Sequence, residues 1–153
     1  MTKTYRSGRG VALATCVIAL GFAGADARAE TALVTYTVNS ALQWGSCPSI
    51  FPKGCQIAVL NGDPAKPNAD VFLRVPGCYT IPAHSHTSAE RMVLIEGRLA
   101  VRYQGAPKAE LTPGAYAYGP PGLPHEATCA GDKPCTLFIA FEGPVDAFAA
   151  SLK

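Results

Sequence analysis

The sequence has few of the features by which common enzyme classes and nucleic-acid-binding proteins are recognised. Charged residues make up only 16% of its 153 residues and form no Lys/Arg cluster, so nucleic acid is not an expected partner. It contains no GXSXG, HEXXH, phosphate-loop or dinucleotide-binding motif, which leaves the corresponding hydrolase, zinc-protease and nucleotide-dependent classes without support. What the chain does contain is abundant glycine and proline, six cysteines and three histidines.

The N-terminus has the three parts of a secretory signal peptide. A basic start at residues 3–9 precedes an apolar run at 11–24, and Ala-Arg-Ala at 27–29 forms a small-x-small cleavage site. The apolar run is shorter than the ~20 residues that a membrane-spanning helix needs, which argues against an uncleaved anchor. We expect a Sec-type signal peptide over 1–29, cleavage after Ala29, and a periplasmic or secreted protein without a membrane attachment.

Removal of the signal peptide changes the charge of the chain. Four of the 13 basic residues and one of the 11 acidic residues precede residue 30, which leaves 13 − 4 = 9 basic and 11 − 1 = 10 acidic residues. The mature chain, residues 30–153, therefore has a net charge of about −1 and is long enough for one domain with a modest core.

Short β-type segments separated by turn residues dominate the mature chain. Residues 56–153 alternate β-branched and aromatic runs with Gly, Pro, Asn and Asp, which predicts an all-β sandwich or barrel. Residues 30–39 predict a first strand, and 40–54 predict a loop or arm over the barrel, so 30–55 form an N-terminal strand and arm. Only residues 144–153 look helical, and they predict a short C-terminal helix.

All the histidines lie in two glycine-framed, strand-like segments. His84 and His86 are two residues apart, so on a strand they face the same side. Glu90 opens the next apolar run and can turn its carboxylate back toward this pair, and His125 comes from a separate segment. Imidazole and carboxylate groups are common donors to divalent metals. The pattern predicts one metal site formed by His84, His86, Glu90 and His125.

These two segments resemble the two motifs of the cupin superfamily. The first, GCYTIPAHSHTSAERMVLIEG at 77–97, has the family order of Gly, His-x-His, Glu and Gly, with the first gap longer by one residue. The second, GAYAYGPPGLPHEAT at 114–128, has the family order of Gly, Pro-x-Gly and His, and Cys129 stands where Asn is usual. The resemblance covers roughly residues 56–142.

The resemblance implies an RmlC-like jelly-roll barrel, a double-stranded β-helix, with one divalent metal held by the four ligands near its lumen. Fe²⁺ or Mn²⁺ is favoured, and Zn²⁺, Ni²⁺ and Cu²⁺ remain alternatives. It further implies a metal-dependent, dioxygenase-like oxidoreductase acting on a small organic molecule, and it allows a homodimer. Two alternatives stay open: a non-catalytic metal-dependent binding or sensor protein of the cell envelope, and a barrel that keeps the ligand residues without a substrate.

Strand alternation suggests further side chains around the metal. Met92 and Leu94 share the parity of Glu90, and Cys78 shares that of the histidine pair. Tyr118 is an aromatic candidate from the second motif. We expect these four residues to border a small, mainly apolar pocket. For Cys78 the alternative is a small buried apolar residue, and for Tyr118 it is ordinary core packing.

Five cysteines remain after signal removal, and this odd number leaves at least one unpaired within a monomer. Cys129 and Cys135 flank a turn between two predicted strands, and Cys47 and Cys55 flank another short loop. Each pair can form a disulfide in an oxidising compartment. Cys47 could instead join the arm to a different loop. Elimination leaves Cys78 as the free thiol.

Overall fold

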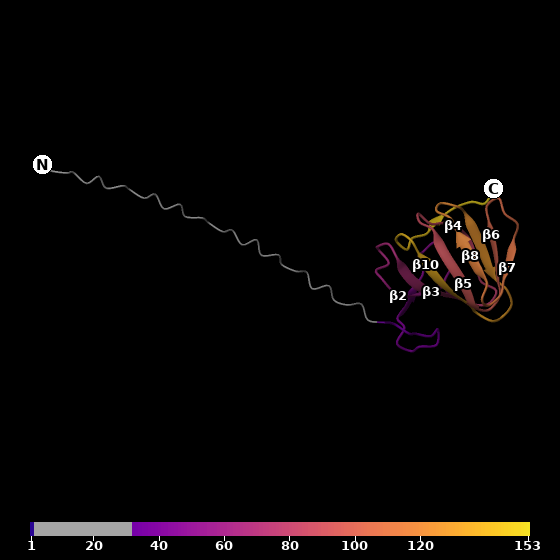
Figure 1. Cartoon of the computed structure of the whole chain (residues 1–153). Helices are drawn as coiled ribbons and strands as arrows, with labels where there is room; N and C mark the ends of the chain where they lie inside the picture. Colours follow the sequence, from indigo (N-terminus) through magenta and orange to yellow (C-terminus); the bar gives the residue numbers. More distant parts are fainter. Residues whose placement is uncertain (2–31) are drawn as a thin grey trace. The chain divides into compact units, whose positions relative to one another are not determined.

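The computed structural model of the chain describes Met1 and residues 32–153 (Figure 1). The predicted signal peptide, apart from Met1, and the start of the predicted first strand lie outside the described residues. The chain divides into the units Met1–Leu33 and Val34–Lys153, and every strand named below belongs to the second unit. In the part of the chain that is described, no helix is long and apolar enough to cross a membrane.

Antiparallel strands form two sheets in the unit Val34–Lys153. The six-stranded sheet contains, in spatial order, β1 (Trp44–Ser46), β2 (Gln56–Asn61), β3 (Ala69–Val75), β10 (Cys135–Phe141), β5 (Glu90–Glu96) and β8 (Tyr116–Gly119). The five-stranded sheet contains β11 (Phe148–Ala149), β4 (Thr80–Ser85), β9 (His125–Cys129), β6 (Leu99–Tyr103) and β7 (Ala109–Leu111). The predicted all-β jelly-roll barrel is confirmed (Figure 1).

Burial alternates along the strands and shows which side chains face the interior. Strand β5 buries Glu90, Met92 and Leu94 and leaves the residues between them more exposed. Strand β9 buries His125, Ala127 and Cys129 in the same way. Successive side chains on a strand point to opposite faces, so these two strands direct both polar and apolar side chains into one interior.

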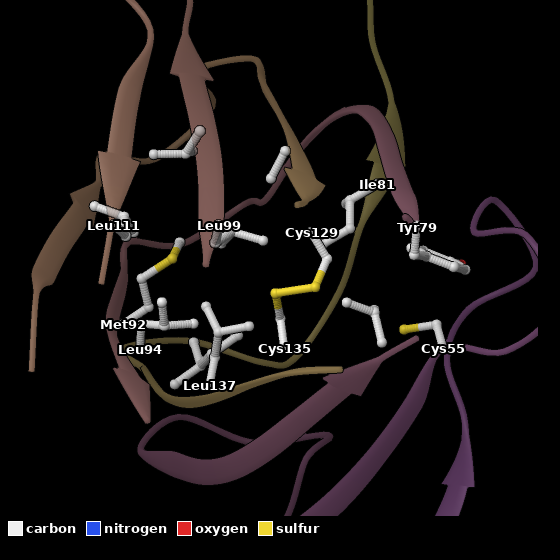
Figure 2. Close-up of a cluster of buried hydrophobic side chains, with 14 of the residues drawn as sticks. Cys55, Tyr79, Ile81, Met92, Leu94, Leu99, Leu111, Cys129, Cys135 and Leu137 are labelled. Carbon is white, nitrogen blue, oxygen red and sulfur yellow. A yellow bond between two sulfur atoms is a disulfide. The ribbon is translucent and has the colours of Figure 1, made fainter. Parts of the chain in front are cut away.

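The apolar core lies between the two sheets (Figure 2). Leu94 and Leu137 from the six-stranded sheet pack with Leu99 from the five-stranded sheet, and all three are at most 2% exposed. Full burial of a leucine side chain stabilises a fold by roughly 1.5–3 kcal/mol. These three side chains therefore contribute to the attraction between the sheets.

Two disulfides occur where the sequence predicts them. Cys47–Cys55 closes the arm loop with a Cα–Cα distance of 5.5 Å, and Cys129–Cys135 joins β9 to β10 with a Cα–Cα distance of 5.8 Å. The second disulfide lies within the core (Figure 2). Among the cysteines that the structure describes, Cys78 is the free one, and it is exposed.

The prediction of a C-terminal helix over residues 144–153 is wrong. The segment instead contains β11, whose residues Phe148 and Ala149 pair with Ser85 and His84 of β4. Ala150 continues this contact by donating its N–H to the carbonyl of Ala83 at 3.0 Å. A helix this short is marginal on its own, whereas pairing with the open edge of β4 satisfies backbone groups directly.

The prediction of a first strand over residues 30–39 is also wrong in its described part. Residues 32–43 contain no strand, and the side chains of Val34 and Val38 are 79% and 88% exposed. High β-propensity has little effect without a partner strand and a buried face. In the described part of the chain the first strand is β1, which pairs with β2. Its Trp44 ring stacks against the guanidinium of Arg74, with 4.1 Å between the ring centroid and Cζ.

Candidate metal centre

The four predicted ligands meet inside the barrel. His84 lies near the end of β4 and His86 just beyond it, Glu90 begins β5, and His125 begins β9. The four residues are between 2% and 8% exposed. One nitrogen from each histidine lies within 4.8 Å of the nitrogens of the other two. Three strand ends thus bring together residues that are separated by up to 41 positions in the sequence (125 − 84 = 41).

Glu90 completes the cluster from the facing sheet. Its Oε1 lies 3.0 Å from Nε2 of His125, and its Oε2 lies 3.4 Å from Nε2 of His86. Opposite Glu90 on β8 stands Gly119, where a Cβ atom would come within 2.9 Å of both Cγ and Oε1 of Glu90. The missing side chain at Gly119 therefore provides the space that the carboxylate occupies.

Backbone carbonyl groups fix the orientation of all three imidazole rings. Nδ1 of His84 contacts the carbonyl of Pro82 at 2.8 Å, and Nδ1 of His125 contacts that of Leu123 at 3.2 Å. Nδ1 of His86 contacts the carbonyl of Asp146. A carbonyl oxygen only accepts hydrogen bonds, so each Nδ1 must carry the proton. In the neutral rings, each Nε2 then offers a lone pair to a metal.

Of the three residues whose carbonyl groups accept these hydrogen bonds, Asp146 also has an anchored side chain. Its carboxylate accepts hydrogen bonds from the backbone N–H of Thr87, at 2.9 Å, and from the hydroxyl of Thr87. Since Thr87 directly follows His86, the two residues are held together at both their backbone and their side chains. No sequence signal identifies Asp146, because it lies 60 positions beyond His86.

Burial and mutual contact shift the pKa values of these groups in different directions. Burial, with further repulsion from the other imidazoles, lowers the pKa of His84 to about 4. Burial alone would lower the pKa of His125 and raise that of Glu90. The contact between their side chains and their opposite charges outweigh burial, so the pKa of His125 is raised and that of Glu90 is lowered.

The donor set fits a divalent cation. Nε2 of His86 and Oε1 of Glu90 are buried and make no well-directed hydrogen bond. In the neutral tautomers, the lone pairs of Nε2 in His86 and His125 face the carboxylate oxygens, an arrangement that a positive ion between them would stabilise. Three imidazoles and one carboxylate are donors that Zn²⁺, Fe²⁺, Mn²⁺, Ni²⁺ and Cu²⁺ all accept. The site can therefore hold a metal ion, and its donors do not select which one.

The metal centre opens into a mainly apolar cavity. Met92 lines this cavity, as the strand parity predicts. Leu94 shares that face but is fully buried in the core and does not line the cavity.

Two predicted pocket residues, Cys78 and Tyr118, lie on the surface instead. Cys78 has a φ angle of 59° in the turn before β4, so the strand parity does not extend to it. Tyr118 pairs with Arg91, which alternates with the inward-facing Glu90 and so points outward; its side chain is 46% exposed. The alternative predictions for these two residues, that Cys78 is buried and that Tyr118 packs in the core, are also wrong.

Two aromatic residues that the sequence analysis did not predict also lie beside the site. The ring centroid of Phe51, from the arm, lies 4.9 Å from that of His84 in an edge-to-face arrangement. Tyr103 lies directly opposite His125 in the sheet, with 5.1 Å between ring centroids, and its buried hydroxyl has no hydrogen-bond partner. Alternation along Leu99, Val101 and Tyr103 is the sequence signal for the tyrosine. For Phe51 no such signal exists, because its loop is irregular.

Comparisons with known proteins agree with this architecture. A family model described as "Cupin domain" matches residues 71–141, which include both histidine-bearing motifs. No sequence among the curated proteins matches the chain.

Solved structures share the fold at low sequence identity. The DMSP lyase DddQ from Ruegeria pomeroyi has a TM-score of 0.60 and 22% identity, covering 73% of this chain and 62% of the lyase. The polyketide cyclase RemF from Streptomyces resistomycificus has a TM-score of 0.63 and 18% identity, covering 79% and 88%. An RmlC-like cupin from Shewanella frigidimarina has a TM-score of 0.58 and 18% identity, covering 74% and 93%.

The chain spans less than two thirds of the length of the lyase, and identities of this size show the fold alone. The family match, the two facing antiparallel sheets and the cluster of His84, His86, Glu90 and His125 at the strand ends nevertheless point to one family. The chain belongs to the cupin superfamily.

Proposed function

We propose that the protein binds one divalent metal ion through His84, His86, Glu90 and His125 and is a dioxygenase-like enzyme for a small organic molecule. One observation carries the proposal. Three imidazoles, each fixed by a carbonyl at Nδ1, line an apolar cavity with one nitrogen of each within 4.8 Å of those of the other two, and two of them direct Nε2 toward the buried carboxylate of Glu90. Such a preorganised set of donors costs stability unless a cation occupies it.

The residues of the site define what it can contribute to a reaction. When bound, a divalent ion supplies Lewis acidity, and Fe²⁺ or Mn²⁺ also supplies reactivity toward dioxygen. Four protein donors would hold the ion without surrounding it, which would leave room for a small molecule beside it. Glu90 balances one unit of the metal charge, and Met92, Ile139 and Phe141 exclude water from the space beside it.

Titratable side chains are scarce around the cavity. Apart from the four ligands, the described residues that line it include one such side chain, Asp146, and its carboxylate is bound to Thr87. A hydrolase generally requires a positioned acid or base. The scarcity of such groups favours oxygen chemistry or plain binding over hydrolysis. Because the neighbours include a lyase and a cyclase, the fold itself does not select the reaction.

Export is the second part of the proposal. Two disulfides in a domain of this size are typical of an oxidising compartment, which supports the predicted signal peptide and a periplasmic or secreted location. In that location Zn²⁺ and Cu²⁺ compete for the site, because they bind nitrogen donors more tightly than Fe²⁺ or Mn²⁺.

Metal analysis combined with oxygen uptake tests the function. The protein, purified from its own compartment, is expected to contain one divalent ion per chain, which His84→Ala or Glu90→Gln removes without unfolding the barrel. Glu96→Gln is the matched control, since Glu96 lies on the same strand but is exposed. Protein reloaded with Fe²⁺ or Mn²⁺ is expected to consume oxygen with one member of a panel of enols, thiols and phenolics.

Two results would lead to different revisions. Stoichiometric metal in both ligand variants would refute the proposed site. Metal binding that depends on these ligands, together with ligand binding but no turnover of any panel member, would favour the alternative of a non-catalytic binding or sensor protein.

A further inference from the structure

One wall of the cavity is formed by a loop outside the family match. The disulfide-closed loop Cys47–Cys55 contributes four of the cavity-lining residues, Cys47, Pro48, Phe51 and Cys55, whereas the family model begins at residue 71. This wall is therefore a feature of the present chain rather than of the part that matches the family model.

Contacts at both of its sides hold the loop in place. At its base, Cys47 and Cys55 are joined by the disulfide, and the N–H of Cys47 donates to the carbonyl of Cys55 at 3.3 Å. Cys55 leads directly into β2 of the six-stranded sheet. On the other side, the hydroxyl of Tyr79 donates to the carbonyl of Pro52, and Tyr79 leads into β4 of the five-stranded sheet. The loop thus connects the two sheets along one side of the cavity.

Phe51 is the residue through which the loop reaches the metal centre. Its ring meets that of His84 edge to face, with 4.9 Å between centroids and an interplanar angle of 90°. The ring also packs against the apolar core. Since His84 is a proposed ligand and Phe51 lines the same cavity, the ring borders the space that a molecule bound at the metal would occupy.

The rest of the lining sets the polarity that the cavity accepts. Apart from the metal ligands, the described lining is formed chiefly by aliphatic and aromatic side chains, and it includes no lysine or arginine. A second carboxylate, a phosphate or a row of hydroxyl groups on a ligand would lose its hydration there without gaining a partner.

We infer that Phe51 is a specificity-determining residue and that the site accepts compact, mainly apolar molecules with a single metal-binding oxygen group. This inference rests on the proposed function, because the oxygen group is placed by the metal. Molecules with two or more charged groups are excluded by the lining, and Phe51 forms the surface on which the apolar part of the ligand packs.

Matched hydroxamates test the inference by isothermal titration calorimetry. Acetohydroxamate, benzohydroxamate and 4-carboxybenzohydroxamate carry the same chelating group but differ in apolar area and charge. With Zn²⁺-loaded wild-type protein, benzohydroxamate is expected to bind at least about tenfold more tightly than acetohydroxamate, because burial of the phenyl ring adds apolar contact. The carboxylated compound is expected to bind at least about tenfold more weakly than benzohydroxamate.

Variants then locate the preference. Phe51→Ala is expected to reduce the preference for benzohydroxamate over acetohydroxamate to about threefold or less. The variant should still bind one Zn²⁺ ion per chain. Phe138→Ala is the matched control, because Phe138 packs against Phe72 and does not line the cavity; it is expected to keep the wild-type preference. Tyr79→Phe, which removes the hydroxyl that anchors the loop, is expected to give an intermediate preference. If Phe51→Ala does not fold, Phe51→Leu takes its place.

The outcomes separate the two proposals. If wild-type protein does not bind Zn²⁺, the proposed function fails before any hydroxamate is added. If Zn²⁺ binds but Phe51→Ala or Phe51→Leu keeps the full preference, or the carboxylated compound binds as tightly as benzohydroxamate, the inference about Phe51 and the substrate class is overturned while the metal site stands.

Discussion

The two ends of the barrel interior use the same strands for opposite purposes. At the metal end, β5 and β9 present Glu90 and His125. Four residues further along the same faces, at the closed end, they present Leu94 and Cys129, both 0% exposed. Alternation along a strand selects which side chains point inward, and the position along the strand determines the end at which they lie.

The two ends differ in how fully their buried groups are satisfied. At the closed end, Leu94, Leu99 and the Cys129–Cys135 disulfide form a packed apolar layer (Figure 2). At the metal end, buried nitrogen and oxygen atoms of His86 and Glu90 lack well-directed hydrogen bonds. Unsatisfied buried polar groups cost free energy, so the packed end must stabilise the fold that holds the metal ligands in position.

Removing the disulfide at the closed end should have the largest effect on stability. The double change Cys129→Ala and Cys135→Ala is expected to lower the free energy of unfolding by about 2–4 kcal/mol, since the cross-link restricts the unfolded chain and both sulfurs are buried. Denaturant unfolding monitored by circular dichroism measures this. Metal bound per folded chain should stay unchanged.

A surface cysteine provides the control for this change. Cys78→Ala removes an exposed thiol and is expected to alter the free energy of unfolding by less than about 0.5 kcal/mol. Loss of metal from the disulfide variant while it remains folded would show that the two ends are not separable in the way described.

At the metal end, Asp146 tests whether ligand orientation matters more than stability. Asp146→Ala removes the carboxylate that holds Thr87 and leaves the carbonyl over His86 free to move. We expect metal affinity to fall by roughly 10–100-fold, as for other residues that orient metal ligands. Competition with a metal-binding dye measures the affinity.

The control for Asp146 is an aspartate in a similar turn. Asp63 also accepts a backbone hydrogen bond, from Ala65 at 2.9 Å, but it is exposed and does not line the cavity. Asp63→Ala should leave metal affinity unchanged. Equal affinity in the Asp146 and Asp63 variants would mean that the carbonyl of residue 146 needs no anchoring.

The shifted pKa values predict that metal affinity and metal-free stability respond to pH in opposite directions. As the pH falls below the raised pKa of His125, a proton occupies the Nε2 that a metal requires, so affinity should fall by up to about tenfold per pH unit. His84 adds no competing proton in this range, because burial lowers its pKa to about 4. Metal titrations at about pH 5.5 and pH 8 measure the slope.

Without metal, protonated His125 and ionised Glu90 stabilise each other. The raised pKa of His125 gives stability that is present below its unfolded value and is lost as the pH rises through the folded value. The lowered pKa of Glu90 gives stability that is present above its unfolded value and is lost in stronger acid. Metal-free protein should therefore gain stability from about pH 8 to pH 5.5, relative to His125→Asn. A gain in metal affinity over the same pH change would contradict the assignment.

Much of the interior could be predicted from the sequence because regular strands obey a simple rule. The inward faces of β5 and β9 follow alternation from Glu90 to Leu94 and from His125 to Cys129. Motif spacing predicted that His84, His86, Glu90 and His125 would come together, and loop length predicted both disulfides. The rule failed at Cys78, where a positive φ interrupts the strand, and over residues 144–153, where an open strand edge offered a better partner than a helix.

Other features of the site depend on contacts that no local pattern encodes. Phe51 reaches His84 only because an irregular loop folds across from one sheet to the other. Asp146 reaches His86 because the C-terminal segment pairs with β4, a pairing that the helix prediction excludes. Gly119 lies between the two glycines of the second motif, and its role became apparent only when β8 was placed beside β5.

Gly119 provides the smallest expected effect and tests the metal end directly. In Gly119→Ala, the new Cβ would approach Cγ and Oε1 of Glu90 to 2.9 Å, which is closer than ordinary contact. The carboxylate, 2% exposed, must shift to relieve this contact. A cost of about 1 kcal/mol corresponds to a roughly fivefold loss of metal affinity.

In Gly45→Ala the new Cβ would meet its nearest atom at 3.9 Å, so this control should bind metal as wild type does. If both variants bind equally well, the carboxylate does not depend on the space at Gly119. If only Gly119→Ala weakens binding, the ligand position is set by the residue facing Glu90 across β5 and β8 as well as by the residues that donate to the metal.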